Sequence, residues 1–183
     1  GGAGAVRFSL PVGPRQTGTF SNPAPVAITF SSAKATPYPS QIAVSGMEGP
    51  VVAVRLVLRG ITVDYSEDLD LLLVSPAGTA IVPMSDVGAG PCSGVDLTLD
   101  AGAASRLPYS NPLSSGTFRP INAGVKKEVF PFPAPKPTRG GLERFAGENP
   151  NGSWKLFVVD PFLGDSGAIA GGWAVEIVTA PCP

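Results

Sequence analysis

The side chains best suited to chemistry in this sequence are carboxylates that fall in two short segments. The six candidates are Asp64, Glu67, Asp68, Asp70, Asp160 and Asp165. Asp68 and Asp70 are two apart, so on one strand they would project to the same side. If the turn around Asp160 and Asp165 folds back beside them, several carboxylate oxygens surround a hard cation such as Ca²⁺. Carboxylates that converge without a cation repel one another, so we expect a structural calcium site wherever the two segments meet.

Two other interpretations of these acids stay open. The carboxylates can be solvated, or they can accept hydrogen bonds from turn amides in Asx-turns. Paired carboxylates also serve glycoside hydrolysis, but that signal is weak here because acids are common at the turns of β proteins.

The sequence contains no histidine, which excludes the usual forms of nucleophilic catalysis. Ser-His-Asp and Cys-His mechanisms and histidine-ligated zinc all need an imidazole. Ser166 lies in a Gly-Asp-Ser-Gly turn and lacks the Gly-x-Ser-x-Gly frame of a nucleophile elbow. We therefore expect a chain that is not itself an enzyme.

The composition is that of a turn-rich folded domain with little charge. The 183 residues include 23 glycines and 21 prolines, 43% are apolar, and only 15% are charged. A net charge of −1 gives no electrostatic footprint for nucleic acid. No run of about 18 apolar residues is present, so no membrane span is expected.

Alternating apolar residues predict about eight or nine β-strands and no long helix. The clearest alternation is in residues 52–63, 69–73, 95–99, 154–158 and 173–177. In the first of these segments Val52, Val54, Leu56 and Leu58 share one phase, and Gly60 falls where a bulge or bend is expected. Residues 6–10, 26–30, 42–44 and 79–84 are weaker candidates. Close spacing without helices indicates antiparallel pairing in an all-β sandwich or jelly roll. Trp154 and Trp173 fall on the apolar phase of their strands, so we expect both in the core rather than exposed as a platform for sugars.

Residues 100–153 contain no confident strand and form an unusually long, proline-rich connection. Within it, the Phe130-Pro131-Phe132-Pro133 stretch favours an extended backbone. Its two phenylalanines are expected to cap an open end of the sandwich; docking of a partner is the alternative.

Cys92 and Cys182 are the two cysteines of the chain. They are too few for a zinc or iron–sulfur centre. A disulfide between them is one expectation, and two unrelated small apolar residues are the other.

Five motifs together resemble the P-domain (P/Homo B domain) that follows the catalytic domain of proprotein convertases and related subtilisin-like proteases. The motifs are residues 68–79 (DLDLLLVSPAGT), 115–120 (SGTFRP), 145–156 (FAGENPNGSWKL), 164–167 (GDSG) and 171–173 (GGW). The resemblance covers residues 38–178, with 1–37 as an N-terminal arm or edge strands and 179–183 as a tail of one domain, 1–183. It is closer to bacterial versions in large secreted or surface proteins.

The resemblance implies a galactose-binding-like jelly roll without catalysis of its own. In the proteases this domain packs on and stabilises the subtilisin domain and tunes its calcium dependence. For this chain it implies a secreted or cell-surface module that stabilises or docks a neighbouring domain or an extracellular partner. A carbohydrate-binding accessory module is the alternative, and a stand-alone hydrolase is the third reading.

Overall fold

The computed structural model describes residues 14–123 and 128–180, and almost all of its regular structure is β. Thirteen strands are present in this part of the chain, together with two short 3₁₀ turns, η1 (Ser66–Asp68) and η2 (Leu142–Phe145). The expectation of an all-β chain is confirmed. The count of eight or nine strands was too low, because three strands have only two or three residues, too few for alternation to identify them.

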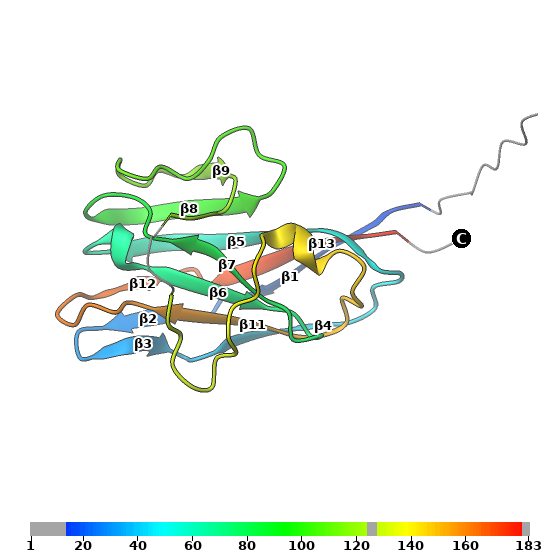
Figure 1. Ribbon diagram of the computed structural model, residues 1–183, viewed down its shortest axis with the longest axis horizontal. Helices are drawn as coiled ribbons and strands as arrows, with labels where there is room; N and C mark the ends of the chain where they lie inside the picture. The colour runs from blue at the N-terminus through cyan, green and yellow to red at the C-terminus, as the bar shows by residue number, and fades with distance from the viewer. Residues whose placement is uncertain (1–13, 124–127, 181–183) are drawn as a thin grey trace, which may run out of the picture.

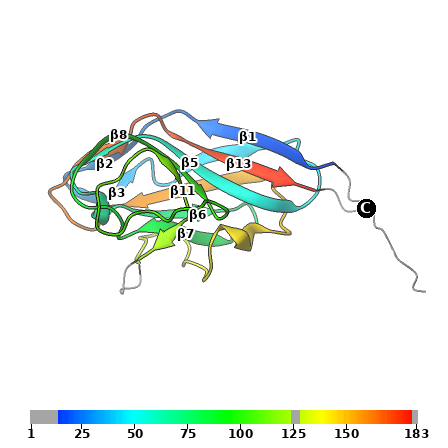
Figure 2. The same ribbon diagram turned by 90° about the horizontal axis from the view of Figure 1, so that it is seen from above.

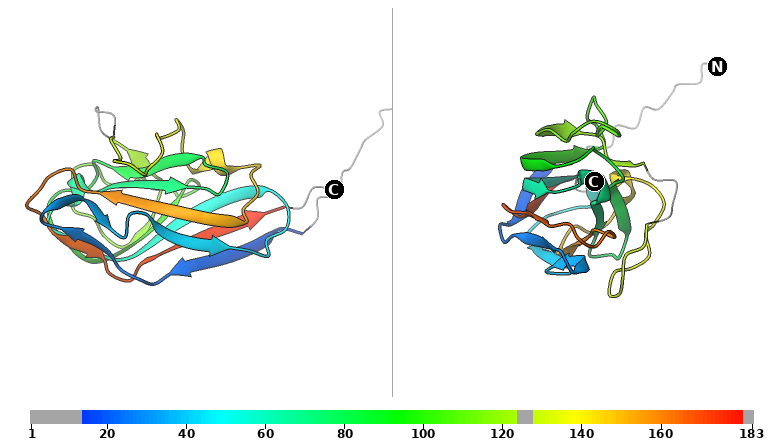
Figure 3. Two further views of the ribbon diagram at one scale, coloured as in Figure 1. Left: turned by 90° about the horizontal axis from the view of Figure 1, so that it is seen from below. Right: turned by 90° about the vertical axis from the view of Figure 1, so that its left-hand side faces the viewer.

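The strands form two layers that face each other across the core (Figure 2). The first sheet contains β1 (Gln16–Asn22), β2 (Val26–Thr29), β5 (Val51–Val63), β8 (Cys92–Asp100), β9 (Gly116–Phe118), β12 (Gly167–Ile169) and β13 (Trp173–Thr179). The second contains β4 (Ser40–Val44), β6 (Asp70–Val74), β7 (Ala80–Ser85), β10 (Ile121–Asn122) and β11 (Gly152–Val159). β3 (Ser32–Thr36) pairs with β2 and with β11, and so joins the two sheets at one edge. The end-on view in Figure 3 shows this cross-section.

Pairing is antiparallel except at two places. β9 runs parallel to β8, and β10 runs parallel to β7. A parallel pair requires a long return connection, and the chain after residue 100 supplies one. The expectation that residues 100–153 contain no strand was therefore wrong, because β9, β10 and η2 all lie there.

A single apolar core fills the space between the sheets. Leu56, Leu97, Val158 and Val175 each have no exposed surface, and they come from four different strands. At about 25 cal/mol per Å² of apolar area, each such side chain contributes roughly 2 kcal/mol relative to exposure. The alternation predicted for β5, β8, β11 and β13 is thus confirmed at the residues that carry it.

Two local irregularities adjust the long strand β5. At Gly60 the backbone φ is +65°, and the pairing with β8 shifts register there, as the glycine in mid-strand indicated. At the start of the strand, Val51 is buried and Val52 is 38% exposed, the reverse of the predicted phase. A second register shift opposite Val51 explains the reversal.

The proline-rich residues 128–137, which we call the strap, cross the outer face of the second sheet (Figure 1). Phe130 is 9% exposed and packs with Leu72 and Phe157. The hydroxyl of Tyr38 donates a hydrogen bond to the Pro131 carbonyl (3.1 Å), and its ring meets Phe157 edge-on at 4.9 Å. The strap therefore covers a sheet face rather than an open end of the sandwich, so the expected place of the cap was wrong.

The two phenylalanines of the strap differ sharply. Phe130 is buried, whereas Phe132 is 89% exposed and leaves one large apolar side chain in solvent.

Cys92 is buried, and its Sγ lies 3.7 Å from the Ile61 carbonyl oxygen. Cys182 and the candidate strand 6–10 lie outside the described residues, so the disulfide and this strand stay predictions.

The described residues limit how a disulfide between Cys92 and Cys182 could form. Cys92 pairs with Val63 at one end of β5, and Ala180 donates to the Pro50 carbonyl at the other. The thirteen residues of β5 span about 40 Å, so Cys92 and Ala180 lie far apart. A disulfide between Cys92 and Cys182 of the same chain therefore requires the end of β13 to leave the sheet.

The contrast between the strap phenylalanines gives a matched test. We expect Phe130→Ala to lower the free energy of unfolding by roughly 3 kcal/mol, because it empties the space between the strap and the sheet. Phe132→Ala should change it by less than about 0.5 kcal/mol, because that side chain is in solvent. Urea unfolding monitored by tryptophan fluorescence measures both values. Equal effects of the two substitutions would show that the strap does not rest on the sheet.

Candidate functional site

The candidate site lies at the end of the sandwich opposite the described chain ends, where β5, β11 and β12 meet (Figure 1). Asp64 follows β5, and its Oδ2 accepts hydrogen bonds from the Ser166 amide (2.8 Å) and hydroxyl (3.1 Å). The Asp64 amide in turn donates to the Ser166 carbonyl (3.3 Å). These bonds hold residues 160–166, the β11–β12 loop, against the chain that leaves β5.

Three carboxylates converge beside this junction. One oxygen each of Asp68, Asp160 and Asp165 lies within 4.8 Å of the others. They come from η1, from the residue after β11, and from the β11–β12 loop. Asp160 is only 5% exposed, and the Phe162 amide donates to its Oδ1 at 3.0 Å. We call these three residues the carboxylate triad.

Neither of the two ion pairs found among the described residues includes a carboxylate of the triad. Burial, and then the charges of Asp160, Glu67, Asp165 and Asp86, raise the pKa of Asp68 to about 6. Burial also raises the pKa of Asp160, although the hydrogen bond from the Phe162 amide acts in the opposite direction. The donor set consists of hard oxygens, which suits Ca²⁺ or Mg²⁺ better than a soft transition metal. A divalent cation at the triad would relieve the repulsion that shifts these pKa values.

The six predicted carboxylates fall into three groups. Asp68, Asp160 and Asp165 form the triad. Asp64 accepts a hydrogen bond from the Ser166 amide, and Glu67 Oε2 accepts one from the Gly90 amide (2.7 Å). These two carboxylates therefore bind backbone amides of turns, which is the alternative interpretation given in the sequence analysis. Asp70 lies in a different cluster. The expectation that Asp68 and Asp70 share a strand face was wrong, because Asp68 belongs to η1 and only Asp70 begins β6.

Asp70 meets two acids that sequence reasoning missed. Oxygens of Asp70, Asp86 and Glu128 lie within 4.8 Å of one another. Burial raises the pKa of Asp70 to about 8; a hydrogen bond with Ser85 opposes this shift, and one with Glu128 adds to it. The Asp70 carboxyl therefore keeps its proton at neutral pH. Glu128 lies far from Asp70 in sequence, and no pattern pointed to the pair.

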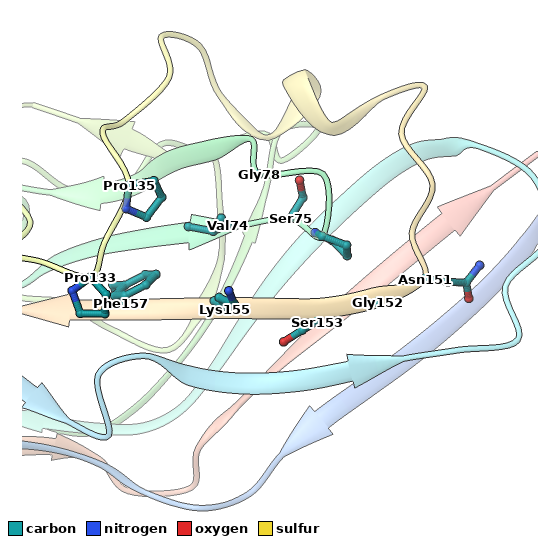
Figure 4. A pocket seen from close by; sticks show the side chains of 11 residues that line it. Val74, Ser75, Gly78, Pro133, Pro135, Asn151, Gly152, Ser153, Lys155 and Phe157 are labelled. Atoms are coloured by element: carbon teal, nitrogen blue, oxygen red, sulfur yellow. The ribbon is translucent and has the colours of Figure 1, made fainter.

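A groove borders the strap on the outer face of the second sheet (Figure 4). Its volume is about 580 Å³, and we call it the strap groove. Pro133, Pro135 and Phe157 form its apolar part, and Lys155 is its one charged lining residue among those the structure describes. Two smaller hollows, of about 380 and 310 Å³, lie elsewhere on the surface.

Both tryptophans belong to the core. Trp154 has no exposed surface and Trp173 is 1% exposed. The indole nitrogen of Trp154 donates to the Pro150 carbonyl (2.9 Å), and that of Trp173 donates to the Ser40 hydroxyl (2.8 Å). The expected core role is confirmed, and neither ring is available as a stacking platform for a sugar.

No family model matches the sequence, and no curated protein matches it. Two solved structures of the serine protease of Aeromonas sobria align with this chain, one of them in complex with the chaperone ORF2. The complex gives 16% identity and a TM-score of 0.42, and the protease by itself gives 14% and 0.41. The alignments cover 94% and 96% of this chain but 27% and 28% of those chains. At these TM-scores the likeness does not establish a shared fold.

None of the helical turns in residues 14–123 and 128–180 is long and apolar enough to cross a membrane.

The raised pKa of Asp70 gives a test of the buried pair. Between pH 4 and pH 8 the folded protein holds a proton that the unfolded chain has released, so this group makes unfolding easier as pH rises. We expect Asp70→Asn to match the wild type near pH 4 and to be more stable at pH 9, by at least about 1 kcal/mol.

Urea unfolding of both proteins across this pH range measures the difference. Glu48→Gln, at an exposed acid, is the control and should follow the wild-type curve. A constant difference between Asp70→Asn and the wild type from pH 4 to 9 would contradict the raised pKa of Asp70.

Proposed function

We propose that this chain is a non-catalytic β-sandwich module, resembling the P-domain, that stabilises or docks a neighbouring domain in a larger secreted or surface protein. A structural cation, most simply Ca²⁺, bound at the carboxylate triad belongs to this proposal. The single observation that carries it is the convergence of Asp68, Asp160 and Asp165 within 4.8 Å.

A cation at the triad would act as a cross-link. Its three ligands come from η1, the end of β11 and the β11–β12 loop, which the described structure otherwise connects through Asp64 and Ser166. Ca²⁺ takes six to eight oxygens, so the carboxylates would supply part of the shell and water the rest. Such a site orders a loop end and adds to stability in proportion to its occupancy.

The arrangement of the described ends supports a docking role. Gln16 pairs with Thr179, so the two ends of the described sandwich leave it side by side (Figure 1). A module held at one end presents the loops of the far end and the strap face to other domains. The hydroxyl of Ser166 donates to the Asp64 carboxylate (3.1 Å), so this side chain helps to hold the β11–β12 loop in place.

Carbohydrate binding, the alternative from the sequence, is not proposed here. Its sequence basis was an exposed tryptophan, and Trp154 and Trp173 are both buried.

Calcium titration with a thermal melt tests the proposal. We expect the melting temperature to rise by several degrees at millimolar CaCl₂, because the cation binds only the folded state. The double substitution Asp160→Asn/Asp165→Asn should abolish this rise, while Glu48→Gln keeps it. No shift with the wild type at millimolar calcium would refute the cation site. Peptidase or glycosidase turnover by the purified chain would refute the non-catalytic role.

The pKa of Asp68 sets the pH dependence of the same titration. Below about pH 6 its carboxyl is protonated in the folded protein, and the proton competes with the cation. We therefore expect about tenfold weaker calcium binding at pH 5 than at pH 7. Isothermal titration calorimetry at the two pH values measures it. Equal affinities would mean that Asp68 is not a ligand.

A further inference from the structure

Three large apolar side chains are exposed next to one another at the loop end of the sandwich. Phe30 is 67% exposed, Phe162 61% and Leu163 67%. The Gly164 amide donates to the Phe30 carbonyl (3.0 Å), which ties the β2–β3 turn to the β11–β12 loop. We call Phe30, Phe162 and Leu163 the apolar tip. Single exposed apolar residues are ordinary, but a contiguous group marks an interaction surface.

Carboxylates lie beside the apolar tip in the chain. Asp160 and Asp165 flank Phe162 and Leu163 in the chain, and Asp68 joins them in the triad. The loop from residue 160 to 166 contains no basic residue. A surface that accepts this tip must therefore combine an apolar hollow with positive charge.

The same chain carries a surface of that description. The strap groove has apolar walls at Pro133, Pro135 and Phe157, with Lys155 beside them (Figure 4). Neither of the two ion pairs found among the described residues includes Lys155. The exposed Lys136 follows Pro135, which adds a second positive charge next to the groove.

The tip and the groove of one copy cannot reach each other. The tip continues beyond the end of β11 at Val159, whereas the groove is lined by residues from Asn151 to Phe157 along the same strand. The β11–β12 loop, which carries Phe162 and Leu163, extends past the end of β11 along the long axis of the molecule (Figure 1). A contact between them therefore requires a second molecule.

We propose that the apolar tip of one copy docks in the strap groove of a second copy, with Lys155 and Lys136 facing the carboxylates beside the tip. The contact joins two different surfaces, so it is heterologous. Each copy keeps one free tip and one free groove, and association continues into short linear chains unless the rotation closes a ring. This inference goes beyond the docking role proposed above and needs no bound cation.

Sedimentation velocity in EDTA at low salt tests the proposal. With the wild type we expect the weight-average sedimentation coefficient to rise with concentration between about 1 and about 200 µM. The tip variant Phe162→Ser/Leu163→Ser and the groove variant Lys155→Glu should each sediment as monomers. High salt should reduce the association of the wild type.

Mixing the two variants is the decisive measurement. The tip variant has an intact groove and the groove variant has an intact tip, so an equimolar mixture should form dimers that grow no further. Val52→Ser and Arg59→Glu, on the first sheet, are the matched controls and should associate like the wild type. Thermal melts of all variants verify folding.

Three results would overturn the proposal. The first is a wild type that stays monomeric at every concentration. The second is a mixture of the two variants that remains monomeric, since the intact tip of one and the intact groove of the other then do not bind each other. The third is equal association of the tip variant and the wild type. Co-sedimentation with phosphatidylserine vesicles that depends on the tip, combined with a monomeric wild type, would assign the tip to a membrane instead.

Discussion

The two sheets are held together by one apolar interface, and the rest of the structure depends on it. Leu56 and Val175 from the first sheet meet Val158 from the second without any exposed surface. Because the interior is filled with hydrocarbon, the charged and polar side chains that could do chemistry are confined to the ends and outer faces. The carboxylate triad, the apolar tip and the strap groove all lie there. The interface thus decides both the stability of the fold and the places where function can be located.

The described residues contain two clusters of carboxylates, one around Asp70 and one at the carboxylate triad, and they differ in protonation. At Asp70, burial raises the pKa to about 8, so this carboxyl keeps its proton at neutral pH. In the triad, Asp68 is more accessible and its pKa is only raised to about 6, so the charge remains at neutral pH. A retained proton makes the first cluster part of the strap's attachment. Retained charge makes the second suitable for a cation.

Strands with one buried face could be predicted from the sequence, together with their inward residues. Features that depend on contacts between distant segments could not. The alternation in β8 and β13 identifies their inward residues because the other face meets solvent. β6 does not alternate in burial, since the strap covers its outer face. Asp70 was assigned to the wrong partners because Asp68 belongs to η1 and not to the strand. The turn that brings Asp160 and Asp165 beside Asp68 was anticipated from residue types alone. The exposed tip was not, because a Phe-Leu pair in a loop has no periodicity that separates a surface from a core.

The adjacency of the described ends has a mechanical consequence. β1 and β13 are antiparallel neighbours, and Gln16, the first residue of β1, pairs with Thr179, the last residue of β13. Tension applied through the two ends would pull along the direction of the hydrogen bonds between β1 and β13. These bonds would then break one pair at a time, starting at Gln16 and Thr179. Strands loaded along their length must instead lose many bonds together. The sandwich is therefore built to yield early under a pulling force at its ends, peeling away β1 first while the core between the sheets stays closed.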